Sequence, residues 1–104
     1  MTEVVVIATL RPLPEHRAEV IAAMEKAIAD VHAHDDGCLL YALNEGDDRL
    51  VMVEKWSSAE ALDQHSRGSA LAELSQALSG RLAGGPDVQR LRPHPAGTPG
   101  QGTV

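Results

Sequence analysis

Apolar residues follow two different periodicities along the chain, and their order predicts the fold. Residues 3–10, EVVVIATL, are apolar and β-branched almost throughout, which is typical of a strand covered on both faces. Residues 15–34 then carry apolar side chains at helical spacing, with Glu, Lys and Asp between them, at Ile21, Met24, Ile28 and Val31. Pro14 suits the first turn of this predicted helix, and Gly37 marks its end.

The second half of the chain predicts a hairpin, an interrupted helix and a last strand. Strands over residues 38–44 and 49–56 flank a short turn, and this close spacing predicts antiparallel pairing. Residues 58–82 have a helical stripe of leucines that is interrupted at Gly68. Gly84-Gly85-Pro86 ends this helix, and residues 87–92, DVQRLR, predict a short fourth strand.

The order β-α-β-β-α-β predicts an α+β, ferredoxin-like fold, in which helices cover one face of a four-stranded antiparallel sheet. Because the strands are apolar on both sides, the other face of the sheet must be covered too. A second copy of the chain packed sheet to sheet would cover it, so we predict a homodimer. We assign residues 1–93 to a single domain. Residues 94–104 are rich in Pro and Gly and form either a frayed tail or an arm ordered against the partner subunit.

Composition and charge narrow the classes of function. The chain has 104 residues and a net charge of −6, which argues against binding to nucleic acid or to anionic membranes. No segment approaches the length of a membrane span, and the N-terminus lacks a basic leader. The single Cys38 rules out an intrachain disulfide. We therefore expect a cytoplasmic protein.

Metal and nucleophile sites find little support in the sequence. His32 and His34 are two apart at a helix end and point in different directions, and no Cys pair or HExxH is present. Cys38, which opens a strand, is most simply a small buried hydrophobe. We predict no metal site.

The stretch 50–65, LVMVEKWSSAEALDQH, gathers the unusual side chains. Ser57 is predicted as the helix N-cap, with Glu60 as its capping-box partner, and His65 then faces inward. His65, Trp56, Tyr41 and Asn44 could line a pocket that binds a flat polycyclic or quinoid substrate. The structural alternative is that Trp56 belongs to the core, the Tyr41 hydroxyl lies at the rim and His65 bonds a backbone carbonyl.

Glu54 is a carboxylate within an apolar strand, and a buried carboxylate needs a partner. Arg49, Arg90 or Arg92 on adjoining strands could supply one, as could a residue of the second subunit. We favour this structural role for Glu54 over a catalytic one.

Several of these residues match the sequence pattern of a known family. Glu54-Lys55-Trp56-Ser57, followed by Ala61-Leu62 and His65, resembles the signature of the antibiotic biosynthesis monooxygenase superfamily. Asp36-Gly37-Cys38 before this stretch and Gly85-Pro86 after it are similar to the family pattern, over residues 3–93. The resemblance implies a dimeric α/β barrel. Many members oxidise quinols or polyketide anthrones with O2, without a metal or prosthetic group.

The resemblance also implies roles for individual residues. His65 would be the base or hydrogen-bond partner of the substrate, Trp56 would border the pocket, and Tyr41 and Asn44 would line it. O2 would be the co-substrate, and no cofactor would be needed.

Two departures from relatives shape the expectation. Quinol-oxidising relatives often carry Thr-Pro-His after the helix histidine, whereas this chain has Arg67-Gly68-Ser69-Ala70. Haem-degrading relatives use an Asn in the first strand, which VVVIATL lacks, and a haem-binding His where this chain has Ser75 or its neighbours. Haem is therefore disfavoured.

Our first hypothesis is a cofactor-independent monooxygenase that acts on a quinol or aromatic polyketide-like substrate. The alternative is a non-catalytic dimeric domain of the same fold that binds a small molecule or serves as an accessory partner.

Overall fold

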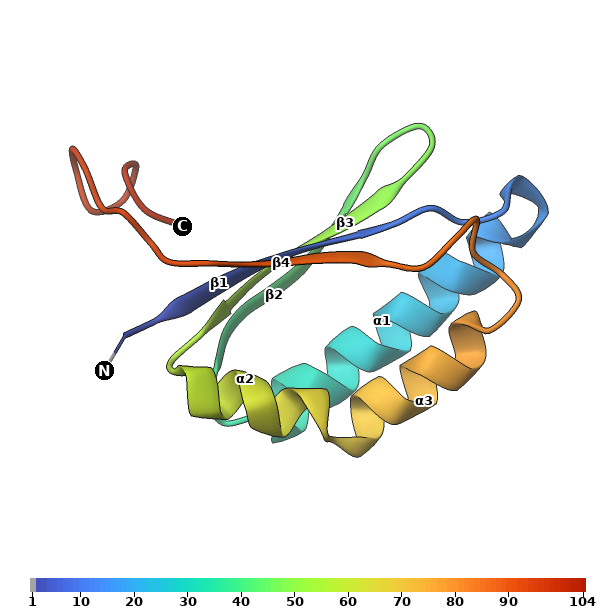
Figure 1. The fold of residues 1–104 in the computed structure, drawn as a ribbon, viewed down its shortest axis with the longest axis horizontal. Helices are drawn as coiled ribbons and strands as arrows, with labels where there is room; N and C mark the ends of the chain where they lie inside the picture. Colours follow the sequence, from blue (N-terminus) through green and yellow to red (C-terminus); the bar gives the residue numbers. More distant parts are fainter. Residues whose placement is uncertain (1) are drawn as a thin grey trace.

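The computed structural model describes residues 2–104. Four strands, three α-helices and a short 3-10 helix follow one another in the predicted order (Figure 1). Their bounds are β1 (Val4–Leu10), η1 (Pro14–His16), α1 (Arg17–His34), β2 (Cys38–Glu45), β3 (Leu50–Trp56), α2 (Ala59–Ser66), α3 (Ser69–Leu78) and β4 (Asp87–Leu91). The ferredoxin-like α+β fold is therefore confirmed.

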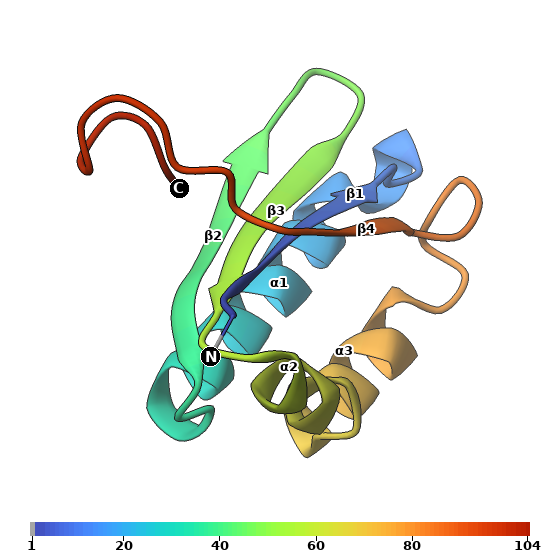
Figure 2. The same ribbon diagram turned by 60° about the vertical axis from the view of Figure 1, so that its left-hand side comes forward.

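The strands form one antiparallel sheet in the order β2-β3-β1-β4, and the three helices cover one of its faces. Figure 2 shows α1 and α3 side by side beneath the sheet, with α2 near the end at which the chain enters β1. This arrangement leaves a layer of side chains between the sheet and the helices, and no helix of residues 2–104 lies on the other face. None of the helices in residues 2–104 is both long enough and apolar enough to span a membrane.

Strand alternation divides β3 as its sequence predicts. The even positions, Leu50, Met52, Glu54 and Trp56, are buried against the helices. The odd positions, Val51, Val53 and Lys55, lie on the outer face and are half-buried. The side chain at each position of β3 is thus committed to one face.

The helical segments differ in detail from the sequence predictions. Ser58, not Ser57, is the N-cap of α2, and its hydroxyl accepts a hydrogen bond from the Ala61 N–H at 3.1 Å. Ser57 instead donates its backbone N–H to the Gly37 carbonyl, so it still belongs to the loop that leaves β3. The interruption at Gly68 is confirmed, because α2 and α3 are separate helices.

The third helix ends earlier than the leucine stripe suggested. α3 stops at Leu78, and Gly80 follows with a φ of +76°, a conformation that favours glycine. Leu82 lies beyond the helix, where it pairs with Pro12 in an isolated β-bridge. The last leucine of the stripe therefore connects the loop after α3 to the segment that follows β1.

The outer face of the sheet and the tail are the least covered parts of the described chain. Residues 92–104 contain neither helix nor strand and project from one end of the molecule (Figures 1 and 2). Large apolar side chains that remain exposed include Leu39 and Leu40 on β2, Leu91 on β4 and Val104 in the tail. Val88 is also exposed, but it pairs with Ala8 on the inner face of the sheet. Such surface is typical of a contact with another chain.

Candidate active site

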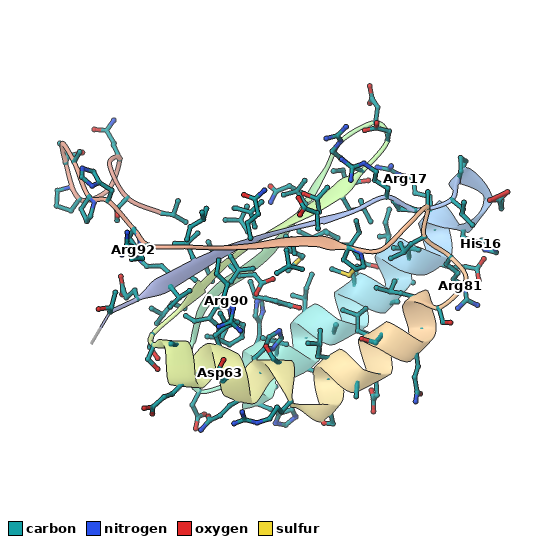
Figure 3. All side chains as sticks on the ribbon, viewed as in Figure 1. His16, Arg17, Asp63, Arg81, Arg90 and Arg92 are labelled. Atoms are coloured by element: carbon teal, nitrogen blue, oxygen red, sulfur yellow. The ribbon has the colours of Figure 1, made fainter. Side chains whose placement is uncertain are left out.

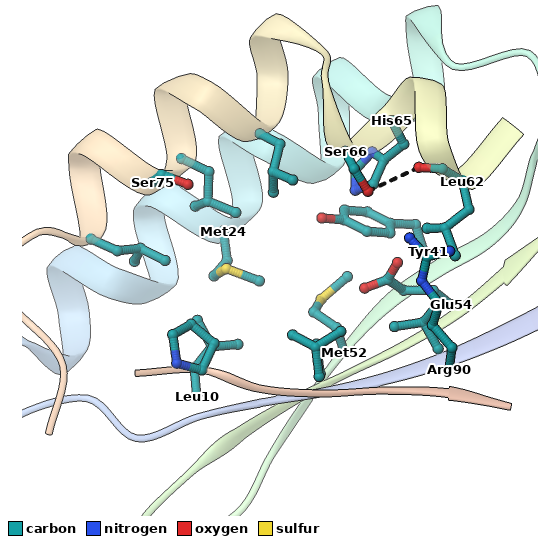
Figure 4. Close-up of a pocket in the computed structure, with 17 residues that line it drawn as sticks. Leu10, Met24, Tyr41, Met52, Glu54, Leu62, His65, Ser66, Ser75 and Arg90 are labelled. Carbon is teal, nitrogen blue, oxygen red and sulfur yellow. Dashed lines mark hydrogen bonds between the residues drawn. The ribbon is translucent and has the colours of Figure 1, made fainter. Parts of the chain in front are cut away.

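A cavity of about 160 Å³ lies between the inner face of the sheet and the helices (Figure 4). Most of its wall is apolar and is supplied by the sheet, the three α-helices and the residue before β4. These apolar residues are Val6, Ala8, Leu10, Met24, Met52, Leu62, Leu71, Leu74, Leu78, Pro86 and Val88. A site of this kind suits an apolar or aromatic molecule.

Polar side chains gather at the end of the cavity that faces α2. Tyr41, Glu54, His65, Ser66 and Arg90 line it there, whereas Ser75 lies apart on α3 (Figure 4). The Tyr41 hydroxyl and the Glu54 carboxylate point into the space between sheet and helices. The Ser66 hydroxyl is already committed, since it donates to the Leu62 carbonyl at 3.0 Å. The cavity is therefore polar at one end and apolar at the other.

Three atoms at the polar end have no hydrogen-bond partner among residues 2–104. They are Nε2 of His65, the hydroxyl oxygen of Tyr41 and Oε2 of Glu54. Within the same residues, no fully buried side-chain nitrogen or oxygen lacks a partner. These three atoms are therefore not sealed in packing, and a molecule in the cavity could bond to them.

His65 is held from the side opposite the cavity. Its Nδ1 lies 2.9 Å from Oδ2 of Asp35, a residue in the turn between α1 and β2. The His65 side chain is only 5% exposed, whereas that of Asp35 is 26% exposed. Because Nδ1 is committed to Asp35, Nε2 is the ring nitrogen that remains available to a ligand.

Trp56 supports the polar end from behind and does not line the cavity. Its ring stacks on His65 at a centroid distance of 4.5 Å, and its Nε1–H donates to Oε1 of Glu54 at 3.0 Å. The Tyr41 ring meets both Trp56 and His65 edge-on. Trp56 is completely buried, so it orients His65 and Glu54 without touching solvent.

Burial raises the pKa values of Glu54 and Tyr41, two of the groups at the polar end of the cavity. The pKa of Glu54 is raised because burial penalises its charged form, although the hydrogen bond from Trp56 opposes this effect. The pKa of Tyr41 is raised far above its ordinary value, first by burial and then by the negative charge of Glu54. Tyr41 therefore stays a neutral hydrogen-bond donor at physiological pH.

Arg90 brings a positive charge to the open edge of the cavity. It lies on β4, and its guanidinium donates to Oδ1 of Asp63 on α2 at 3.3 Å (Figure 3). The pair bridges the sheet edge and the helix that carries His65. Both side chains are about half exposed, so the contact can open without a large cost.

The structure brings Tyr41 and His65 to one cavity and leaves Asn44 elsewhere. Asn44 is exposed on the outer face, where its amide donates to the carbonyls of Ala42 and Val51. The reason is strand alternation: Tyr41 and Asn44 are three positions apart on β2, so they face opposite sides. Asn44 is therefore not part of this site.

Glu54 is buried as predicted, but among residues 2–104 no arginine, including Arg92, forms an ion pair with it. Arg90 pairs with Asp63 and Arg49 pairs with Asp48, and the hydrogen bond to Glu54 comes from Trp56. Residues two apart on a strand share a face. That spacing was the signal in the sequence that could have identified Trp56 as the partner.

Asp35, Ser66 and Arg90 were missed as site residues. Asp35 is separated from His65 by thirty residues, so only the tertiary fold reveals their contact. Ser66 could have been found, because it lies four residues after Leu62 and therefore shares a helix face with this inward-facing leucine. Arg90 could have been found from alternation on β4 once its register with Val6 was known.

Other chemistries are weakly supported in the described residues. No group of three or more His, Cys, Asp or Glu side chains in residues 2–104 is arranged to hold a metal ion. Cys38 is half-buried, and burial raises the pKa of its thiol, which lowers its reactivity as a nucleophile.

Solved structures with the same fold come from several microorganisms. The Mycobacterium tuberculosis protein Rv0793 is 27% identical, with a TM-score of 0.86 over 93% of this chain and 100% of that one. A Caulobacter crescentus CB15 protein, provisionally named an antibiotic biosynthesis monooxygenase, is 27% identical, with a TM-score of 0.83 over 86% of this chain and 88% of that one. A conserved protein of Methanosarcina mazei Go1 is 25% identical, with a TM-score of 0.81 over 88% and 93% of the two chains.

The sequence comparison assigns the family. A search of curated proteins finds no match. Residues 3–77, which include β1 to α3 and therefore Asp35, Tyr41, Glu54 and His65, match the family model described as antibiotic biosynthesis monooxygenase. On this match, which spans most of the sequence, the chain belongs to the antibiotic biosynthesis monooxygenase family.

Proposed function

We propose that the protein is a monooxygenase that oxidises a phenolic, quinol-type substrate with O2. The observation that carries this proposal is the set of three free polar atoms, on His65, Tyr41 and Glu54, at one end of an otherwise apolar cavity. A phenol has the matching shape, because it is a flat apolar ring with one acidic hydroxyl. The family membership supports the reaction class.

The size of the cavity favours a small substrate. An engineered protein cavity of about 150 Å³ binds benzene, and this cavity measures about 160 Å³. One aromatic ring therefore fits with its hydroxyl at the polar end. A larger polyketide-like substrate would extend through the open edge beside Arg90, so we favour a single-ring quinol.

The polar end supplies the groups that a quinol oxidation needs. Nε2 of His65 takes the proton of the substrate hydroxyl, and the electron pair of the broken O–H bond stays on the substrate oxygen. The neutral Tyr41 hydroxyl then donates a hydrogen bond to the phenolate. The phenolate is electron-rich and passes electrons to O2. One atom of O2 is incorporated into the hydroxyquinone product, and the other leaves as water with the two hydrogens that the quinol loses.

The apolar wall of the cavity favours entry of the second reactant, O2. O2 is apolar and enters an apolar cavity more readily than water does. Low polarity around the phenolate also strengthens its interactions with Tyr41 and His65. As the family resemblance implies, we propose that no metal or prosthetic group takes part and that O2 is the co-substrate.

We further propose that the protein works as a homodimer joined through the outer face of the sheet. Val51, Val53 and Ile7 lie on this face, and Leu40 and Leu91 at its two edges are exposed. A second copy would cover this surface. The tail at residues 94–104 is near enough to the sheet edge to contact that second copy. Sedimentation equilibrium should give twice the chain mass at micromolar concentration, and a monomer would contradict the dimer.

Oxygen uptake with a panel of alkyl hydroquinones and anthrones tests the function. We expect uptake by the wild type with single-ring quinols, a loss of about 100-fold in His65→Ala, and little change in Asn44→Ala, the matched polar variant outside the cavity. Equal uptake by the wild type and His65→Ala would remove His65 from the mechanism. If no member of the panel is oxidised aerobically, the non-catalytic binding domain becomes the better account.

A further inference from the structure

We propose that Asp35 is a positioning residue that fixes the tautomer of His65, so that Nε2 presents a lone pair to the cavity. The kinetic consequence rests on the proposed function, but the tautomer does not. The observation is the contact of 2.9 Å between Nδ1 of His65 and Oδ2 of Asp35, with His65 itself buried.

The hydrogen-bonding capacity of the carboxylate and the imidazole determines which ring nitrogen carries the proton. An ionised carboxylate can only accept, so Nδ1 of His65 must carry a proton to bond to Asp35. A neutral imidazole has one N–H, and Nε2 is then unprotonated. Nε2 has no partner in residues 2–104 and is not sealed, so its lone pair is free to accept the proton of a hydroxyl in the cavity.

Two spaces meet at His65, and Asp35 lines only one of them. His65 lines both the main cavity and a small cleft of about 110 Å³. His34, Asp35, Asp36, Gly37 and Gln64 line this cleft together with Ala61 and His65. Water in this cleft can therefore solvate Asp35, whereas the imidazole of His65 forms part of the wall of the main cavity.

The chain turn that carries Asp35 is seated closely on α2. The Asp35 N–H bonds to the Val31 carbonyl at the end of α1, and its carbonyl accepts from Cys38 at the start of β2. Gly37 makes the approach possible, because a Cβ there would overlap the Cβ of Ala61 on α2. The absence of a side chain at Gly37 thus allows the turn and His65 to meet.

Protonation during turnover strengthens the pair. When Nε2 takes the substrate proton, the ring becomes an imidazolium whose charge faces the Asp35 carboxylate. The proton on Nε2 is later returned to the reduced oxygen that leaves as water, and the ring regains its first tautomer. Asp35 itself touches neither the substrate nor O2.

The test combines a spectroscopic and a kinetic measurement on the full chain. Nitrogen-15 NMR of ring-labelled histidine, with His65 assigned by comparison with His65→Gln, should show the proton on Nδ1 in the wild type. In Asp35→Asn the amide can donate to Nδ1, and the proton should move to Nε2. With a quinol that the wild type oxidises, kcat should fall about 10- to 100-fold while KM changes less than about threefold. This is a smaller loss than the ~10⁴-fold effect of the corresponding change in a buried serine-protease triad.

Two matched variants separate positioning from folding. Asp36→Asn removes a neighbouring exposed carboxylate and should leave both the tautomer and kcat unchanged, whereas Asp35→Glu should keep the proton on Nδ1 and recover part of kcat. Circular dichroism should be the same for all. A wild-type proton on Nε2, or an Asp35→Asn spectrum identical to the wild type, would overturn the proposal. If the tautomer shifts as expected but the wild type oxidises no quinol, the positioning role stands and the proposed function fails.

Discussion

The two faces of the sheet have opposite characters although they share the same backbone. On the inner face of β3, Glu54 and Trp56 bond to each other and Trp56 stacks on His65. On the outer face, Val51 and Val53 are apolar, and no helix in the described part of the chain covers them. The inner face is thus completed within one chain and holds a cavity with chemical groups. Within residues 2–104 the outer face carries no helix, and the proposed homodimer would cover it.

The largest expected effect is on the inner face. Trp56→Ala should lower the free energy of unfolding by about 3–5 kcal/mol, because it removes a fully buried ring and leaves a cavity. Denaturant unfolding measures this loss. Val51→Ala on the outer face should cost far less in a dilute, monomeric sample, and equal losses for the two variants would erase the distinction between the faces.

A charge on the outer face should break association and spare the fold. Val53→Glu should weaken self-association by about 3 kcal/mol, because a buried unpaired carboxylate is costly, while its far-UV circular dichroism stays that of the wild type. Ala29→Glu, on the exposed side of α1, adds the same charge and is the control. Sedimentation decides: if Val53→Glu remains as associated as Ala29→Glu, another surface forms the dimer.

The buried carboxylate should make stability depend on pH. The pKa of Glu54 is raised in the folded protein, so its contribution is fully present in acid and is lost as the pH rises through the folded pKa. Glu54→Gln can still accept the Trp56 hydrogen bond and avoids the buried charge. It should therefore be more stable than the wild type by about 1 kcal/mol at pH 8 and no more stable near pH 4. A gain in acid that disappears in alkali would contradict this sign.

The smallest effect concerns the helix that presents His65. Ser58→Ala removes the N-cap of α2 and should cost about 1 kcal/mol in thermal or denaturant unfolding. Ser57→Ala is the matched control and should be nearly neutral, because the Ser57 backbone makes the contact with Gly37. The opposite order would restore Ser57 as the cap.

The sequence was sufficient for the fold because its apolar periodicity and turn residues agree. Strand alternation placed Glu54 and Trp56 on one face of β3, and helical spacing turned Leu62 and His65 inward; all four are buried. Alternation also excludes Asn44 once Tyr41 is known to face the cavity. A β-bulge between Cys38 and Leu40 complicates the count from the start of β2, because it resets which residues share a face.

The remainder of the site depends on contacts between distant segments. Asp35 reaches His65 only because Gly37 and Ala61 are small enough for a turn and a helix to touch. No local pattern encodes that approach. Arg90 enters the site through the pairing of β4 with β1, which the sequence indicates in type but not in register.

We propose that the inner-face cavity is the substrate site, and the fluorescence of Trp56 can measure ligand binding there directly. Trp56 is the only tryptophan of the chain and lies against His65, so its fluorescence should report a ligand at the polar end. In an anaerobic titration with methylhydroquinone, a single-ring quinol small enough for the cavity of about 160 Å³, we expect a saturable change at one ligand per chain. Ala8→Leu, which fills the apolar part of the cavity, should bind at least about tenfold more weakly, and Asn44→Ala should bind like the wild type. Equal binding by Ala8→Leu and the wild type, or no saturable change in either, would contradict the claim.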